Sequence, residues 1–168
     1  MRLDDRIIEG NSMKSMNNEQ VGLLERRRVD FKDFVGESMD ILTDFLQRLG
    51  AADPSKISIS AEEFLPLIDS WMSWQIVTPE DRVWIITRIG YFIGELLNQK
   101  FSGHWMLDEE ADSPYFSQYI VGDFANLPII KSKIAPFALA KNYVDSPEGR
   151  SLLSVLLKVE SELRNIIS

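Results

Sequence analysis

The chain contains no cysteine and a single histidine, His104. The first absence excludes disulfide bonds, thiolate metal sites and cysteine nucleophiles, and it fits a reducing compartment. The second leaves only one possible base for a nucleophile-histidine-acid relay, and no Gly-x-Ser-x-Gly turn accompanies it. The sequence therefore favours a structural or surface role for His104 over a catalytic one.

Long apolar runs and large basic clusters are also missing. No apolar stretch reaches the ~20 residues that a membrane-spanning helix needs. The first ten residues lack a basic patch followed by an apolar stretch, so we expect no secretory signal. The formal net charge of -8 disfavours binding to nucleic-acid phosphates. We expect a cytoplasmic protein that binds neither nucleic acid nor a membrane.

The chain offers no convincing cofactor motif. A phosphate-binding glycine loop with its lysine is absent, and so is Gly-x-Gly-x-x-Gly after a strand. Four acids could supply oxygen ligands, but their spacing lacks the central glycine and distal glutamate of a calcium loop. These acids are Asp108, Glu109, Glu110 and Asp112. The sequence predicts no metal, no other cofactor and no catalytic residue set.

What is present suits one domain. A chain of 168 residues can bury about 70% of the surface that its unfolded form exposes. Residues 1–18 show no periodicity and are interpreted as a loosely ordered leader. Residues 19–168 are interpreted as a single α+β domain, mainly helical, with a small antiparallel sheet of about three strands packed on a long central helix.

The central helix is predicted between Thr78 and Gly103. Thr78 suits the N-cap, and Pro79 suits the first helical position. Gly90 and Gly94 lie one turn apart on its apolar face, where each costs about 1 kcal/mol of helix propensity. We interpret them as a packing notch against a neighbouring helix or the sheet. Gly103 is expected to reverse the chain in a left-handed conformation.

Other elements follow from periodicity and turn signals. Ser60 followed by Glu63 resembles a capping box for the second helix, and Pro66 either kinks that helix or marks its real first turn. Helices are predicted from 19 to 49, through 64–72, from 136 to 141 and from 146 onward. Strands are predicted over 104–107, 115–121 and 127–134.

Negative charge concentrates after the central helix. Residues 104–128 hold five acids and no lysine or arginine. We therefore expect an acidic hairpin that engages a basic protein partner. The expected partner-binding residues are Asp108, Glu109, Glu110, Asp112, Tyr115 and Asp123.

An alternative reading places a pocket at the junction of helix and strand. Glu95 follows Gly94 on an otherwise apolar helix, and a buried carboxylate needs a partner or an upward pKa shift. With His104, Trp105 and Asp108 it would form a small-molecule pocket or a hydrolase site. The simpler interpretation gives Glu95 a salt bridge or hydrogen bond to the facing sheet.

Several short motifs carry a resemblance. They are Gly90-Tyr91-Phe92-Ile93-Gly94-Glu95-Leu96, then Gly103-His104-Trp105, then an acidic turn and Pro136-Phe137 leading to Lys141. Across residues 78–163 the chain resembles a bacterial domain family of unknown function, and similar small domains occur among immunity proteins of toxin systems. The turn after Trp105 lacks the glycine usual there, and Asn142 stands where a second basic residue is usual. The resemblance implies an α+β fold and an immunity-type or adaptor role.

Overall fold

The computed structural model describes residues 15–127 and 132–165. It confirms an α+β fold that is mainly helical with a three-stranded antiparallel sheet. The α-helices are α1 (Asn18–Arg48), α2 (Leu65–Ser73), α3 (Pro79–Phe101), α4 (Pro136–Val144) and α5 (Leu152–Asn165). Two 3-10 helices are η2 (Pro54–Ser58) and η3 (Ala61–Phe64), and the strands are β1 (His104–Leu107), β2 (Tyr119–Gly122) and β3 (Lys133–Ile134).

Helix α3 is the central element, as predicted. It packs most extensively against α4 and also contacts α1, η3, β1 and β2. The Thr78 hydroxyl accepts a hydrogen bond from the Asp81 N–H, 3.3 Å away, and Pro79 occupies the first turn. Its inward face is almost fully buried, and the apolar residues on it are Ile85, Ile89, Phe92, Ile93, Leu96 and Leu97.

The glycine notch on α3 receives aromatic rings. A methyl group at Gly90 would overlap the ring of Phe137 from α4, and one at Gly94 would overlap the ring of Trp105 from β1. Only glycine lets these rings approach the helix backbone so closely. The predicted packing notch is confirmed, and it accommodates rings from a helix and from the sheet.

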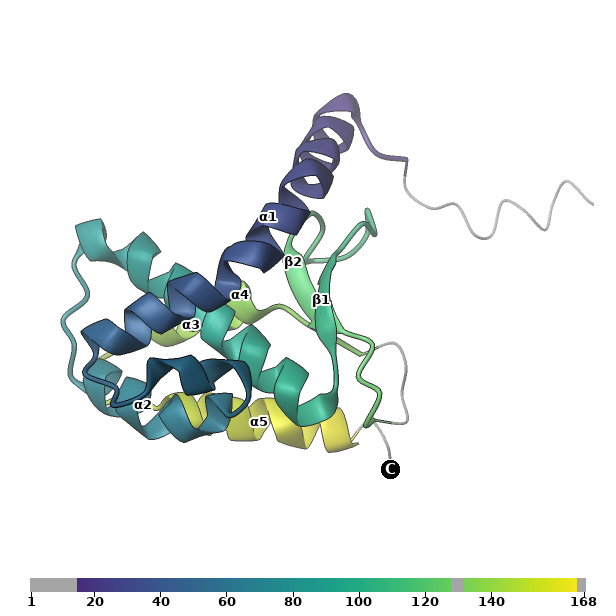
Figure 1. The fold of residues 1–168 in the computed structure, drawn as a ribbon. Coiled ribbons are helices and arrows are strands. Elements are labelled where there is room, and N and C mark those ends of the chain that lie inside the picture. Colours follow the sequence, from purple (N-terminus) through teal and green to yellow (C-terminus); the bar gives the residue numbers. More distant parts are fainter. Residues whose placement is uncertain (1–14, 128–131, 166–168) are drawn as a thin grey trace, which may run out of the picture.

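The N-terminal half of α1 projects from the body of the molecule, and the β1–β2 hairpin lies beside it (Figure 1). The C-terminal half joins the core through Leu42, Phe45 and Leu46. Helix α5 runs along the opposite side of the body, against α2 (Figure 1). The predicted leader lies largely outside the described residues, and α1 begins at Asn18 with Asn17 as its N-cap.

The sheet is smaller than predicted. Its order is β1-β2-β3, and Trp105 pairs with Val121, which in turn pairs with Ile134. The predicted hairpin is present, but its second strand begins at Tyr119 because residues 108–118 form turns. Of the predicted strand over 127–134, β3 keeps only two residues, and residues 128–131 lie outside the described ranges.

Three predicted helix ends were wrong. Ser102, not Gly103, takes the left-handed conformation after α3, with φ 53°. Gly103 is needed for space instead, because a Cβ there would lie 2.6 Å from Phe124 Cε1 and 2.9 Å from the Gly122 carbonyl oxygen.

The other two errors concern helix starts. Ser60 makes no capping hydrogen bond, and a 3-10 turn leads into α2, which begins at Leu65 with Pro66 in its first turn, as the alternative start predicts. Helix α5 begins at Leu152, several residues later than predicted. Its first N–H groups donate to the Asp69 carboxylate on α2, with Leu152 N–H at 2.7 Å and Leu153 N–H at 3.3 Å. Ser151 caps the same end locally, because its hydroxyl accepts from the Ser154 N–H at 3.2 Å, whereas the part supplied by Asp69 leaves no local sequence signal.

Candidate functional site

Glu95 has a partner on its own helix. Its carboxylate accepts a hydrogen bond from Gln99 Nε2 at 3.0 Å, whereas the simpler sequence interpretation predicts a partner on the facing sheet. Burial raises the pKa of Glu95 above its ordinary value, and the hydrogen bond from Gln99 only partly offsets that effect. Gln99 also donates to the Ile57 carbonyl and accepts from the Ala61 N–H, so it fastens the η2–η3 segment to α3.

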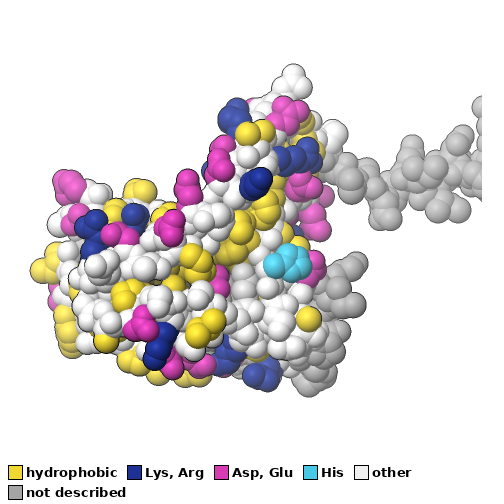
Figure 2. Space-filling model, viewed as in Figure 1, with side chains coloured by type: hydrophobic (Ala, Val, Ile, Leu, Met, Phe, Trp, Pro, Cys, Tyr) yellow, Lys and Arg dark blue, Asp and Glu magenta, His cyan; other side chains and the backbone are white. Residues whose placement is uncertain are grey.

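The other residues of the predicted junction pocket have different neighbours. His104 lies 3.4 Å from Asp123, and both side chains are at least half exposed. Figure 2 shows the histidine at the surface with an acidic side chain beside it. Trp105 is buried, with its ring on Gly94. The structure does not bring Glu95, His104 and Asp108 together around one cavity.

Asp108 is an internal residue of the hairpin turn. Its side chain is only 1% exposed, and its oxygens accept hydrogen bonds from Ser113 Oγ (2.5 Å), Lys133 Nζ (2.9 Å) and the Glu110 N–H (3.1 Å). Burial opposes its ionisation, but these donors outweigh burial and hold the pKa of Asp108 below its usual range. This carboxylate shapes the turn and is not available for direct contact with a partner.

Two further acids of the hairpin turn also engage groups of the same chain. Glu109 forms an ion pair with Arg28 on α1, and Glu110 pairs with Lys133 at 3.0 Å. Asp112 is exposed, and Asp123 lies beside His104 at the other end of the hairpin. The five acids therefore do not form a continuous unpaired acidic face.

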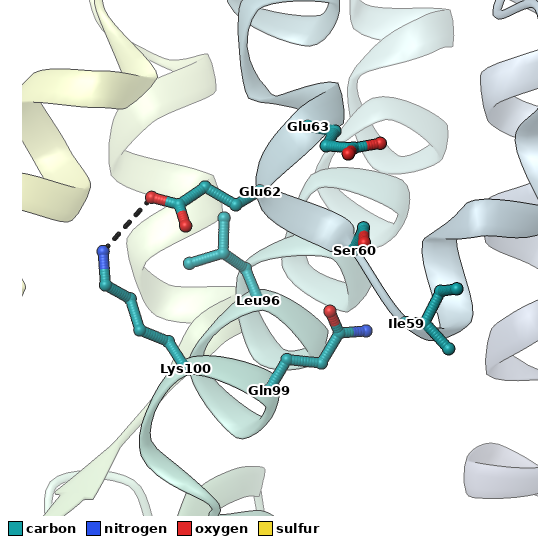
Figure 3. Close-up of a pocket in the computed structure, with 7 residues that line it drawn as sticks. All are labelled: Ile59, Ser60, Glu62, Glu63, Leu96, Gln99 and Lys100. Carbon is teal, nitrogen blue, oxygen red and sulfur yellow. Dashed lines mark hydrogen bonds and ion pairs between the residues drawn. The ribbon is translucent and has the colours of Figure 1, made fainter.

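A small polar hollow lies between η3 and α3 (Figure 3), with a volume of about 270 Å³. Its lining residues are Ile59, Ser60, Glu62, Glu63, Leu96, Gln99 and Lys100. Lys100 bridges Glu62, at 3.2 Å, and Glu160 on α5. Because Lys100 and Gln99 are both engaged in joining η3 and α5 to α3, we interpret this hollow as a structural contact between elements.

An aromatic cluster fills the space between the projecting helix and the body. Its members are Phe31, Phe34, Tyr91, Trp105, Tyr119 and Phe137. Phe34 is at its centre, because its ring centroid lies 4.1 Å from Tyr119 and 4.9 Å from Tyr91. Stacked and edge-on rings at such distances stabilise one another beyond the effect of burial.

Two tyrosines in this cluster also fasten α1. The Tyr91 hydroxyl donates to the Phe34 carbonyl at 3.2 Å, and the Tyr119 hydroxyl donates to the Arg27 carbonyl at 2.9 Å. Burial raises the pKa of Tyr91 to about 12, so its hydroxyl keeps its proton at neutral pH. The projecting helix is therefore held in a defined position over the cluster.

Two adjoining hollows open onto this cluster, and together we call them the aromatic groove. The first, of about 350 Å³, is lined by Arg27, Phe34, Thr87, Tyr91, Gln118, Tyr119 and Phe137. The second, of about 580 Å³, is lined by Arg82, Val83, Ile86, Thr87, Pro114, Tyr115, Gln118, Phe137, Ala138, Lys141 and Asn142. They share Thr87, Gln118 and Phe137, so the two hollows lie next to each other.

The aromatic groove is lined by aromatic and apolar side chains together with polar and basic ones. Val83 on its rim is 68% exposed, although valine is usually buried. Tyr115, one of the predicted partner-binding residues, lines it beside Pro114. Phe34, Tyr91, Thr87 and Phe137 were not among the predicted site residues, because their pattern reads as ordinary core.

A second exposed apolar pair lies elsewhere. Trp74 and Ile76, in the loop before α3, are 74% and 78% exposed. Over the described ranges, no group of three or more histidine or acidic side chains is arranged to hold a metal ion. None of the described helices has the length and apolar character needed to cross a membrane.

Comparisons with family models, with curated proteins and with solved structures gave no match.

Proposed function

We propose that this chain is a non-catalytic protein-binding module whose contact surface is the aromatic groove and the hairpin beside it. The observation that supports this most is the groove itself, where apolar and aromatic side chains from α1, α3, α4 and the hairpin meet at an open surface. Aromatic side chains set in such hollows contribute most of the affinity in many protein interfaces. An immunity-type or adaptor role would be one form of this function.

The proposal fits the way the surface is built. The ring of Phe137 packs on Gly90 of α3, and the ring of Trp105 packs on Gly94. The hydroxyls of Tyr91 and Tyr119 donate hydrogen bonds to backbone carbonyls of α1. A surface fixed in this way loses little conformational entropy on binding. The alternative of a hydrolase around Glu95, His104 and Asp108 gains no such support, because each of these residues has its own separate neighbours.

The proposal is tested by affinity capture from the native host with a variant that fills the groove. Thr87 lies where the two hollows meet, so Thr87→Trp should occupy both of them. Lys158→Trp, on an exposed position of α5, is the matched control. We expect at least one protein that wild type and Lys158→Trp recover equally and that Thr87→Trp loses. Equal recovery of every captured protein by all three would refute the proposal.

A further inference from the structure

The charge of the aromatic groove is opposite to the charge of the molecule. The chain carries 26 acids against 18 lysines and arginines, for a net charge of -8. Yet no acidic residue is among the described residues that line the two hollows, whereas Arg27, Arg82 and Lys141 are. An anionic group would therefore meet favourable charge in this groove, although much of the remaining surface would repel it.

Two of these three cations are exposed and form no ion pair within the described residues. Arg82 is engaged, because Asp145 accepts hydrogen bonds from its Nε and from Nη2, both at 2.7 Å. The Arg27 guanidinium stands 5.7 Å from the centre of the Tyr119 ring and shares a hydrogen bond with the Tyr119 hydroxyl, which leaves its other N–H groups for a ligand. Within residues 15–127 and 132–165, neither Arg27 nor Lys141 lies within ion-pair distance of a carboxylate, although Asp145, which is paired with Arg82, also attracts Lys141 from farther away.

These two exposed cations stand in different parts of the groove. Arg27 lines only the first hollow and Lys141 only the second, with Thr87, Gln118 and Phe137 shared between them. A ligand that reaches both would run across the shared floor and place apolar groups on Phe34, Phe137 and Val83. An open groove of this form suits a peptide segment better than a small molecule, which is usually enclosed on most of its surface.

We propose that the aromatic groove binds a segment of a partner protein in which apolar or aromatic side chains are flanked by aspartate or glutamate. This inference rests on the proposed protein-binding function and adds the chemistry of the partner. The apolar side chains supply affinity by burial on the aromatic floor. The carboxylates pair with Arg27 and Lys141 at the rim and supply selectivity.

The test uses a phage-displayed library of random 12-residue peptides, selected on the full chain. We expect enriched peptides to combine aromatic or apolar residues with acids, and to lose binding to Thr87→Trp. As synthetic fluorescent peptides in anisotropy titrations, they should bind Arg27→Glu and Lys141→Glu about fivefold more weakly than wild type, consistent with exposed ion pairs. Lys158→Glu should bind as wild type does. Higher salt should weaken binding to wild type.

Three outcomes would overturn the inference. If the enriched peptides lose binding to Thr87→Trp but are neutral or basic, the preference for acidic segments is wrong, while the proposed protein-binding function is not contradicted. Enriched peptides unaffected by Thr87→Trp, or no enrichment, would remove the peptide groove itself. Self-association of wild type that Thr87→Trp abolishes would make a second copy the occupant. Circular dichroism and thermal melting establish that each variant is folded.

Discussion

Gly90 and Gly94 connect the central helix to the candidate site at the scale of single residues. Phe137, which lies on Gly90, forms the floor that the two hollows of the groove share. Trp105, which lies on Gly94, packs edge-on against Phe34, with ring centroids 5.0 Å apart. The two glycines thus position the aromatic rings that the groove presents.

We predict that Gly94→Ala destabilises the fold. Alanine gains about 1 kcal/mol of helix propensity. The new methyl group would overlap Trp105, however, and overpacking of this kind costs about 1–3 kcal/mol. The measurement is the free energy of unfolding from urea titration. Gly36→Ala is the matched control, since no described atom outside its local helix lies within 4 Å of the added Cβ, and it should stabilise α1. Stabilisation by both changes would contradict the notch.

Glu95 gives a prediction with a defined pH dependence. Its pKa is raised in the folded state by burial, so folding favours the protonated form. The stability that the fold gains from protonating Glu95 is fully present below the ordinary pKa of 4.5, and it is lost as the pH rises through the raised pKa of the folded state. Glu95→Gln removes the charge but keeps an acceptor for Gln99. We expect the variant to be at least as stable as wild type at pH 7, with the difference shrinking toward pH 4.

Unfolding midpoints of the two proteins across that pH range provide the measurement. A loss of stability in Glu95→Gln that is as large at pH 7 as at pH 4 would show that the fold needs the carboxylate itself.

At the scale of elements, helix α5 is held by a residue far away in the sequence. Asp69 on α2 accepts from the Leu152 and Leu153 N–H groups and from the Tyr143 hydroxyl, so it joins α2, α4 and α5. Burial, together with the charge of Asp69, raises the pKa of Tyr143, which therefore remains a donor at neutral pH. This carboxylate takes the first two N–H groups of α5 and so adds to the local cap at Ser151, whose hydroxyl accepts from the Ser154 N–H at 3.2 Å.

Asp69→Ala should therefore cost about 1–3 kcal/mol of stability, because it leaves the first N–H groups of α5 and the Tyr143 hydroxyl without their acceptor. Ser60→Ala is the control, since Ser60 resembles an N-cap in the sequence but makes no capping hydrogen bond. It should change stability by less than about 0.5 kcal/mol. Urea unfolding of both variants decides the matter, and equal effects would contradict the role of Asp69.

Helices α3 and α5 together show which helix starts the sequence could predict and which it could not. Helix α3 was located correctly because Thr78 and Pro79 signal its start locally. The start of α5 was misplaced because Ser146-Pro147-Glu148 resembles a helix start, whereas the helix begins after Ser151 and is also capped by Asp69, 83 residues before Leu152. Likewise the groove joins Phe34, Thr87, Gln118 and Phe137, and only tertiary packing brings these together. Phe34 and Phe137 carry no sign that distinguishes them from core residues.

At the scale of the whole molecule, the way in which charged side chains pair determines the local surface charge more than the net charge does. The cluster of acids after α3 led us to expect a basic partner. In the structure, Asp108, Glu109 and Glu110 pair with Lys133 or Arg28, while Arg27 and Lys141 remain at the groove. An overall negative charge therefore coexists with a local surface suited to an acidic, apolar segment.

The central claim is that the aromatic groove is the surface through which this chain binds another protein. The most direct measurement is site-specific photocross-linking in the native host, with p-benzoylphenylalanine placed at Tyr115 in the groove or at Lys158 on α5. We predict a discrete cross-linked protein from position 115 that position 158 does not give and that Thr87→Trp abolishes. Cross-linking to the same protein from both positions, or from position 158 alone, would contradict the claim.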